Sequence, residues 1–258
     1  MGKSNVPHKT VFTRQTRREA KTYVATIYKG LAFLHPAMRD CSDIVYAGVE
    51  SCGMALQFAS TRLKNHDSIV VAAVRNCGPA LQFASPRLQN KKGLVFLACA
   101  LNANAFQYAS PRLKASRQFV FKMVCQFGEA LQYAAPALQN DEAIVLAAIR
   151  TGVVCHAAPC YSPLKFASET YRNNKELVEI AVKLEGLAIV YADKMLQLDQ
   201  HLIKLAVAQN GQVLELLDNV WKHNLDIVVT AVKQNPWAFD FASTELQLNP
   251  AVIAARDC

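Results

Sequence analysis

The residues best placed to do chemistry in this sequence are arginines that recur 25 residues apart. Arg62, Arg87 and Arg112 each follow the same short motif, and Lys64 and Lys114 stand two residues after the first and the third of them. Cationic groups aligned along one edge of a protein bind phosphates or carboxylates. The spacing therefore predicts a basic stripe for an anionic partner, with a solvated turn position as the alternative.

A second group of reactive residues has the composition of a metal site. Cys155, His156 and Cys160 lie within the nine-residue segment Gly152-Val-Val-Cys-His-Ala-Ala-Pro-Cys160. Structural zinc sites take four ligands and commonly include a Cys-x-x-Cys pair. This segment has no such pair and no evident fourth ligand, so we predict no metal here. We interpret the segment as an insertion that docks a partner or bends the chain.

Known catalytic motifs are missing from the sequence. It contains no P-loop, no dinucleotide-binding glycine motif, no nucleophile elbow and no His-Glu-x-x-His helix. The six histidines show no spacing typical of a catalytic triad. We therefore expect a non-enzymatic protein without a cofactor.

Positive charge is concentrated in the front half of the chain. Residues 1–22, which include Arg14, Arg17 and Arg18, carry six basic side chains and one acidic side chain. The net charge is +5 in this segment, +6 in residues 23–151 and −3 in residues 152–258. This asymmetry favours contact between the N-terminal half and an anionic neighbour. A solubilising tail and an organellar targeting segment are alternative interpretations of residues 1–22.

A tandem repeat determines where these residues lie. The motif Gly53-Met-Ala-Leu-Gln-Phe-Ala-Ser60 recurs, with small changes, from Gly78, Ala103 and Gly128. The frame resumes at Leu164-Lys-Phe-Ala-Ser168, and weaker copies begin at the residues Gly186, Gly211 and Pro236, with a shortened copy at Gly30. Self-similarity at a fixed period is typical of repeat architectures. The sequence therefore predicts about nine units of 25 residues.

The apolar positions inside a unit predict helices. Counting the glycine as position 1, position 11 is usually Leu, and apolar side chains recur at helical spacing from position 17, as in residues 69–74. The motif itself is typical of a shorter helix that Ser-Pro-Arg closes, because the residue before proline is pushed out of the helical region. An Asn-Asp pair such as Asn140-Asp141 is expected to cap the longer helix, and the next glycine to end it.

Two helices of this size cannot bury both of their faces, so neighbouring units must stack. We predict an all-α fold, an α-solenoid of about nine 25-residue helix-turn-helix repeats. The expected divisions are a basic N-terminal tail (1–22), an N-terminal repeat sub-array (23–151), an insertion (152–160) and a C-terminal repeat sub-array (161–258).

The repeat pattern also resembles a known family. The consensus Gly-x-Ala-Leu-Gln-[Phe/Tyr]-Ala-Ser-Pro, followed by Leu-Gln-Asn-Asp and an apolar helix, is similar to the repeats of the domain-of-unknown-function 4116 family. The resemblance is strongest over residues 53–151. It implies a helical repeat module and supplies no catalytic residues.

These observations favour a scaffold, or an accessory subunit of a larger intracellular assembly. Protein partners would bind along the solenoid surface, and an anionic neighbour would bind the basic N-terminal half. Nucleic-acid binding, for example within a ribonucleoprotein, is the alternative function.

Membrane insertion and secretion are not expected. The longest apolar run, Leu94–Leu101, is far shorter than the ~18 residues of a membrane-spanning helix, and residues 1–22 lack the apolar block of a secretory signal. The eight cysteines are too few for a disulfide scaffold. We therefore predict reduced thiols in an intracellular, reducing compartment. A cytoplasmic and an organellar location, in a mitochondrion or a plastid, remain open, as does the oligomeric state.

Overall fold

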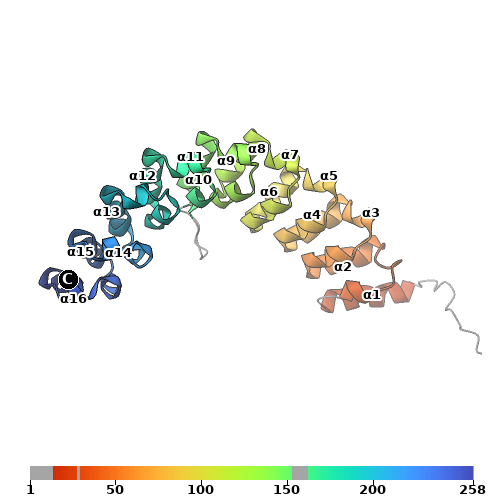
Figure 1. The fold of residues 1–258 in the computed structure, drawn as a ribbon. Helices are drawn as coiled ribbons and strands as arrows, with labels where there is room; N and C mark the ends of the chain where they lie inside the picture. The colour runs from red at the N-terminus through yellow and green to blue at the C-terminus, as the bar shows by residue number, and fades with distance from the viewer. Residues whose placement is uncertain (1–13, 28–29, 153–161, 258) are drawn as a thin grey trace, which may run out of the picture. The chain divides into compact units, whose positions relative to one another are not determined.

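The computed structural model describes residues 14–27, 30–152 and 162–257. Every regular element in these ranges is a helix (Figure 1), which confirms the predicted all-α repeat fold. The chain divides into two compact units, the N-terminal unit Met1–Leu113 and the C-terminal unit Lys114–Cys258.

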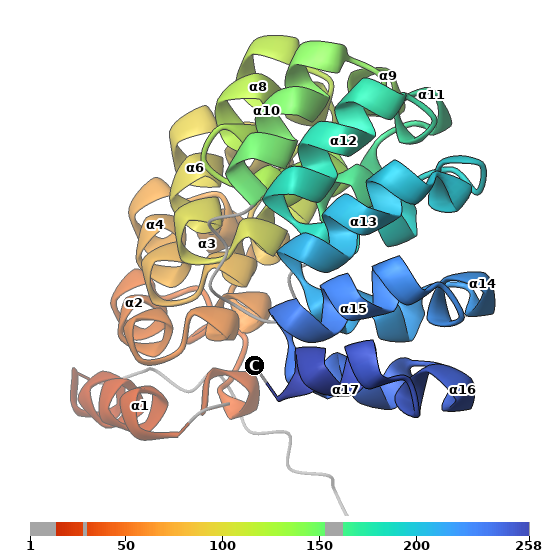
Figure 2. The ribbon, with the colours of Figure 1, turned by 90° about the vertical axis from the view of Figure 1, so that its left-hand side faces the viewer.

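The N-terminal unit alternates short 3-10 helices (η) with α-helices. In Figure 2 the long helices of consecutive repeats lie side by side, and α4 packs against both α2 and α6. The elements are α1 (Arg14–Thr26), η1 (Gly30–Phe33), α2 (Ser42–Ser51), η2 (Gly53–Phe58), α3 (Thr61–Lys64), α4 (Asp67–Asn76), η3 (Gly78–Phe83), α5 (Pro86–Gln89), α6 (Lys92–Leu101), η4 (Ala103–Tyr108) and α7 (Pro111–Lys114), within which the unit ends.

The C-terminal unit continues the same alternation, with α12, α13, α15 and α17 packed in sequence (Figure 2). Its elements are α8 (Arg117–Val124), η5 (Gly128–Tyr133), α9 (Pro136–Gln139), α10 (Glu142–Gly152), η6 (Pro163–Phe166), α11 (Glu169–Arg172), α12 (Lys175–Leu184), η7 (Gly186–Tyr191), η8 (Leu196–Leu198), α13 (Gln200–Gln209), η9 (Gly211–Leu216), α14 (Asn219–Lys222), α15 (Leu225–Gln234), η10 (Pro236–Phe241), α16 (Thr244–Gln247) and α17 (Pro250–Arg256).

The first half of each repeat differs from the expected two-turn helix. The motif forms a 3-10 helix, and Ser-Pro-Arg begins a second short α-helix instead of closing the first one. Ala84 and Ser85 have extended backbones, and Pro86 is then the first residue of α5. Proline suits this position because its fixed φ is helical and its missing N–H would have no helical partner there.

The core consists of the apolar columns that the sequence predicts. Leu63 and Leu88 at position 11 are fully buried, and each long helix buries a stripe such as Ile69, Val70, Ala73 and Val74. Burying a side chain of this size contributes about 1.5–3 kcal/mol. Stacking of the repeats therefore buries one continuous apolar layer within each unit.

The glycine that opens a repeat is required by packing. A Cβ atom on Gly53 would clash with the carbonyl oxygen of Ala73 in the long helix of the same repeat, and one on Gly211 would clash with that of Ala231. Cys52, the residue before Gly53, has an extended backbone, so no left-handed helix cap is formed here. The 3-10 helix thus lies directly against the backbone of the next long helix.

Part of the predicted N-terminal tail belongs to the repeat stack. Helix α1 begins at Arg14 and packs on α2 through the buried side chains of Ala20 and Val24. Ser51 of α2 also donates a hydrogen bond to the carbonyl of Ala25 at 2.8 Å. Ala20 and Val24 are one helical turn apart and share a face, so residues 14–22 of the predicted tail are part of helix α1, which continues to Thr26.

The insertion near residues 152–160 does not interrupt stacking. Ser168 donates its backbone N–H to Gln139 across it at 3.0 Å, as Ser85 does to Lys64 at 2.9 Å. The separation between the side-chain partners in this contact is 28 residues here and 20 elsewhere. The additional eight residues leave the contact intact, and the two compact units divide between Leu113 and Lys114, not at the insertion.

The described thiols differ in their expected reactivity. Burial raises the pKa of Cys99 to about 12, whereas Cys125 is exposed. Because the thiolate is the nucleophile, maleimide at neutral pH should modify Cys125 rapidly and Cys99 only after unfolding. Site-resolved mass spectrometry of a time course checks this, and equal labelling rates in the folded protein would contradict the packing of α6.

Candidate functional site

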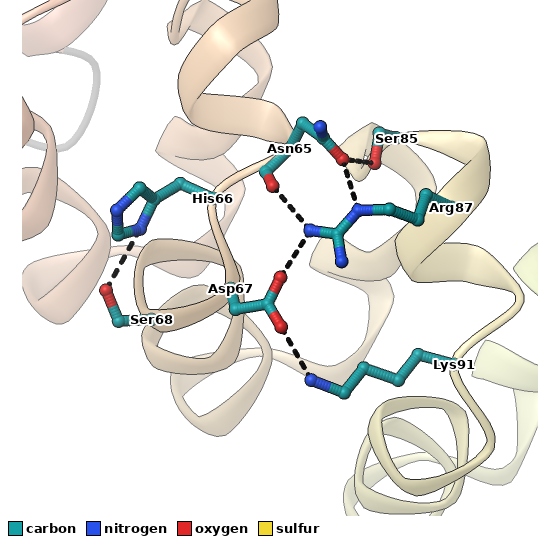
Figure 3. Close-up of polar contacts among 7 residues, drawn as sticks. All are labelled: Asn65, His66, Asp67, Ser68, Ser85, Arg87 and Lys91. Atoms are coloured by element: carbon teal, nitrogen blue, oxygen red, sulfur yellow. Dashed lines mark hydrogen bonds and ion pairs between the residues drawn. The ribbon is translucent and has the colours of Figure 1, made fainter.

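Neighbouring repeats are joined by polar contacts that involve the predicted arginine stripe. In Figure 3, Ser85 donates to the Asn65 side chain at 2.6 Å, and Arg87 donates to the side chain and the carbonyl of Asn65 at 2.9 and 2.8 Å. Asp67 pairs with Arg87 and, at 2.6 Å, with Lys91. We call Asn65, Asp67, Ser85, Arg87 and Lys91 the Asp67 clasp.

The preceding pair of repeats has an equivalent contact, the Asp40 clasp of Asp40, Ser60 and Arg62. Arg62 donates to the carbonyl of Asp40 at 2.6 Å and to its carboxylate at 3.1 Å, and Ser60 also donates to that carboxylate. Hydrogen bonds from Ser60 and Arg62 hold the pKa of Asp40 below its usual value. Arg62 is thus already paired with a carboxylate of its own chain.

Arg87 is paired in the same manner. Hydrogen bonds from Lys91 and Arg87 lower the pKa of Asp67, which stays ionised at neutral pH. The Arg62 and Arg87 side chains are nevertheless 61% and 57% exposed. They therefore connect repeats while keeping part of each guanidinium accessible to solvent.

Arg112, the third arginine of the stripe, differs from the other two. It is exposed, and no carboxylate among the described residues pairs with it. Lys92 occupies the position that Asp67 holds one repeat earlier. The stripe therefore contains two arginines with internal partners and one without an ion pair.

Lys64 and Lys114 belong to a different structural column, position 12. Both are half-buried, and burial lowers the pKa of Lys114. In other repeats this residue donates to carbonyls at the end of the 3-10 helix: Gln89 to Leu81 at 3.2 Å, Gln139 to Leu131 at 3.1 Å and Lys222 to Glu215 at 2.9 Å. Position 12 is always a long N–H donor: Arg39, Lys64, Gln89, Lys114, Gln139, Arg172, Gln197, Lys222 and Gln247.

The remaining predicted residues lie apart from the clasps. Arg17 and Arg18 are exposed on α1, near an ion pair between Lys21 and Asp43 of 3.8 Å. Arg14 is the first residue of α1. Cys155, His156 and Cys160 lie outside the described residues. Within the described ranges, no three His, Cys, Asp or Glu side chains gather in a group that could hold a metal ion.

The structure also contains an apolar edge that sequence reasoning missed. Met195, Leu198, Val220 and Leu248 of the C-terminal unit are between 55% and 79% exposed. They occupy positions 10 and 13, where the N-terminal unit has the arginines and asparagines of its clasps. Comparing the residue types at positions 10 and 13 from repeat to repeat reveals this apolar edge in the sequence.

A second overlooked feature is a carboxylate that serves two neighbouring repeats. Asp199 accepts from the backbone N–H groups of His201 and Leu202 at 2.9 and 3.3 Å, and it pairs with Lys175 of the preceding repeat at 2.6 Å. Asp141 caps α10 and pairs with Arg117 in the same way. Each carboxylate both begins a long helix and connects it to the repeat before it.

The Asp199 contact predicts a pH dependence. The hydrogen bond from Lys175, followed by those from Leu202 and His201, lowers the pKa of Asp199 from 3.8. Its stabilisation is therefore complete above this ordinary value and is lost as the pH falls through the lowered one. Asp199→Ala should cost about 1–2 kcal/mol of unfolding free energy at pH 7.

Urea denaturation of wild type and variant between about pH 2 and pH 7 measures this difference. Asp199→Asn is the matched control, because it keeps a capping oxygen and removes only the charge. A difference between wild type and Asp199→Ala that stayed constant through the acid range would contradict the assignment.

The comparisons with known proteins agree with this repeat geometry. No helix in the described part of the chain is both long and apolar enough to cross a bilayer. No curated protein and no solved structure matches the chain significantly. A family model described as "Domain of unknown function (DUF4116)" matches residues 41–89, 68–114, 91–139, 116–154, 160–197 and 199–247. Because these matches cover most of the sequence in tandem, the chain belongs to the DUF4116 family.

Proposed function

We propose that this protein is a non-enzymatic scaffold, or an accessory subunit of a larger intracellular assembly, that binds a protein partner. The observation that carries the proposal is the apolar edge of the C-terminal unit. Its four side chains are exposed although polar residues occupy the same positions in the N-terminal unit. Leu198 and Val220 stand at positions 13 and 10 of consecutive repeats, the two positions that meet in the Asp67 clasp, and exposed apolar surface is typical of protein-binding sites.

Stacking of the repeats does not require this apolar edge. Trp221 donates its indole N–H to Gln197 at 3.0 Å, and Ser243 donates its backbone N–H to Lys222 at 2.9 Å. These contacts connect the same repeats that present Leu198 and Val220. The exposed side chains are therefore available to a partner without loss of the fold.

The N-terminal unit supplies a surface of opposite chemistry. Residues 1–113 carry 15 basic and 5 acidic side chains. Arg17, Arg18 and Arg112 are exposed on the N-terminal unit. An anionic neighbour is attracted to such a surface over a range of about 10 Å at moderate salt. An intracellular, reducing compartment is part of the proposal, and the free thiols of the described cysteines support it.

Co-purification of the tagged full chain from native extract tests the scaffold function. We expect stoichiometric protein partners with wild type and their loss with the double substitution Leu198→Ser and Val220→Ser. Leu101→Ser removes an exposed leucine of α6 outside the apolar edge and is the matched control. A chain that stays monomeric and without partners, or partners retained equally by both variants, would contradict the proposal.

Nucleic-acid binding is the second candidate function. The observation that favours it is a stretch of 61 residues, 68–128, with eight basic side chains and no acidic one. Affinity for a labelled RNA should then fall steeply as salt rises from about 50 to 200 mM. Substitution of Arg62, Arg87 and Arg112 by glutamate should abolish this binding, and binding that survives it would exclude the stripe.

A further inference from the structure

The contact after the Asp67 clasp has the same backbone frame. Ser110 donates its N–H to Gln89 at 3.0 Å and its hydroxyl to Asn90 at 2.6 Å. The corresponding distances at Ser85 are 2.9 and 2.6 Å. Position 15 of one repeat therefore lies relative to position 10 of the next as it does in the Asp67 clasp. We call Asn90, Lys92, Ser110 and Arg112 the Lys92 clasp.

The two clasps differ in the residue at their centre. Asp67 precedes Arg87 by 20 residues, and Lys92 precedes Arg112 by 20 residues. The Asp67 carboxylate joins the cations Arg87 and Lys91. In the Lys92 clasp a lysine stands at the position of Asp67, opposite Arg112. Both side chains are exposed, and neither has an ion pair within the described part of the chain. The Lys92 clasp thus lacks the anion that completes its neighbour.

The surroundings leave room for an external anion. A Cβ atom built on Gly93, next to Lys92, would meet no atom within 4 Å. The first turn of α6 carries no acidic residue, and no aspartate or glutamate occurs from residue 68 to residue 128. The carboxylate that precedes this stretch, that of Asp67, is already paired with Arg87 and Lys91.

We propose that the Lys92 clasp binds an aspartate or glutamate side chain from an acidic segment of a protein partner. The template is internal, because Arg87, the counterpart of Arg112 one repeat earlier, holds the Asp67 carboxylate in the equivalent place. The planar guanidinium matches a carboxylate through two parallel N–H donors. The inference rests on the proposed scaffold function and specifies the chemistry of one contact with the partner.

Fluorescence anisotropy of a labelled peptide of alternating glutamate and glycine, titrated with the full chain at about 50 mM salt, tests the proposal. Lys92→Asp should weaken binding at least about tenfold, because the new carboxylate pairs with Arg112 as Asp67 pairs with Arg87. Arg75→Asp on α4 changes the net charge equally, at an exposed cation outside the clasps. We expect it to weaken binding less than about twofold.

Thermal unfolding keeps the result interpretable. Lys92→Asp should melt at or above the wild-type temperature, since it gains an internal ion pair. Equal peptide affinity of Lys92→Asp and wild type would overturn the proposal. Equal losses in Lys92→Asp and Arg75→Asp would also overturn it, because net charge alone would then explain the binding.

Two further measurements separate this inference from the alternatives. The wild-type chain is also titrated with a single-stranded RNA of about 12 nucleotides. If wild type binds this RNA and not the peptide, and Lys92→Asp does not bind the RNA, the ligand is a nucleic acid and the carboxylate assignment is overturned. The Leu198→Ser and Val220→Ser variant should bind the peptide as wild type does. A wild-type chain that co-purifies with protein partners but does not bind the peptide would refute the Lys92 clasp as a carboxylate site and leave the scaffold function intact.

Discussion

Gly53→Ala and Gly211→Ala should each lower the free energy of unfolding by about 2–3 kcal/mol. The added methyl group would meet a backbone carbonyl in the long helix of the same repeat, that of Ala73 or Ala231, and a backbone oxygen cannot rotate away as a side chain can. The 3-10 helix must then move away from the long helix of its own repeat and lose buried apolar contact. Urea denaturation followed by circular dichroism measures the change.

Gly93→Ala is the matched control for this prediction. Gly93 lies in α6 with open space around the position of a Cβ atom. Alanine is the better helix former, so this variant should be more stable than wild type by about 0.5–1 kcal/mol. Glycine-to-alanine substitution is thus expected to lower the free energy of unfolding where the glycine packs against a backbone, and to raise it where the glycine faces open space. Destabilisation of similar size in all three variants would contradict the close approach of the 3-10 helix to the long helix that follows it.

Trp221→Ala should cost about 3–5 kcal/mol of unfolding free energy. Trp221 is buried at position 11, where most repeats have leucine, and its indole N–H donates to Gln197 at 3.0 Å. This hydrogen bond replaces the backbone contact that Ser85 makes with Lys64. The substitution therefore removes both a large core side chain and a connection between repeats.

Trp237→Ala is the control, because Trp237, the second of the two tryptophans, is 78% exposed. We expect a change within about 0.5 kcal/mol. The emission of Trp237→Ala, which retains Trp221, should lie at shorter wavelength than that of Trp221→Ala. Equal stability losses, or equal emission maxima, would contradict the packing of α14.

The sequence was sufficient to predict the repeat length, the all-α class and the core columns. Leu63, Leu88 and Ile69 recur in register, and apolar periodicity fixes which face of a helix is buried. Periodicity could not distinguish a 3-10 helix from a short α-helix over six residues, because a stretch of six gives too few turns to separate the two periods. The buried part of the N-terminal tail was missed because only Ala20 and Val24 mark it.

The arginine stripe shows where sequence reasoning about the site reached its limit. Identical arginines at position 10 have different surroundings, since the residues that face them lie 20 or 22 residues earlier, in other columns of the repeat. The lysines at position 12 were grouped with the stripe by charge, although the whole column shares N–H donation. Which repeat positions contact each other depends on the register in which neighbouring repeats stack. The sequence of a single repeat does not determine that register.

Calorimetric stoichiometry of the glutamate–glycine peptide with wild type, Lys92→Asp and Asp67→Lys tests the central claim most directly. Asp67→Lys puts a lysine where Lys92 stands in the Lys92 clasp and leaves Arg87 and Lys91 without their carboxylate. We predict that Lys92→Asp loses one peptide site relative to wild type and that Asp67→Lys gains one. The same number of sites in all three proteins would contradict the claim that a carboxylate completes these contacts between repeats.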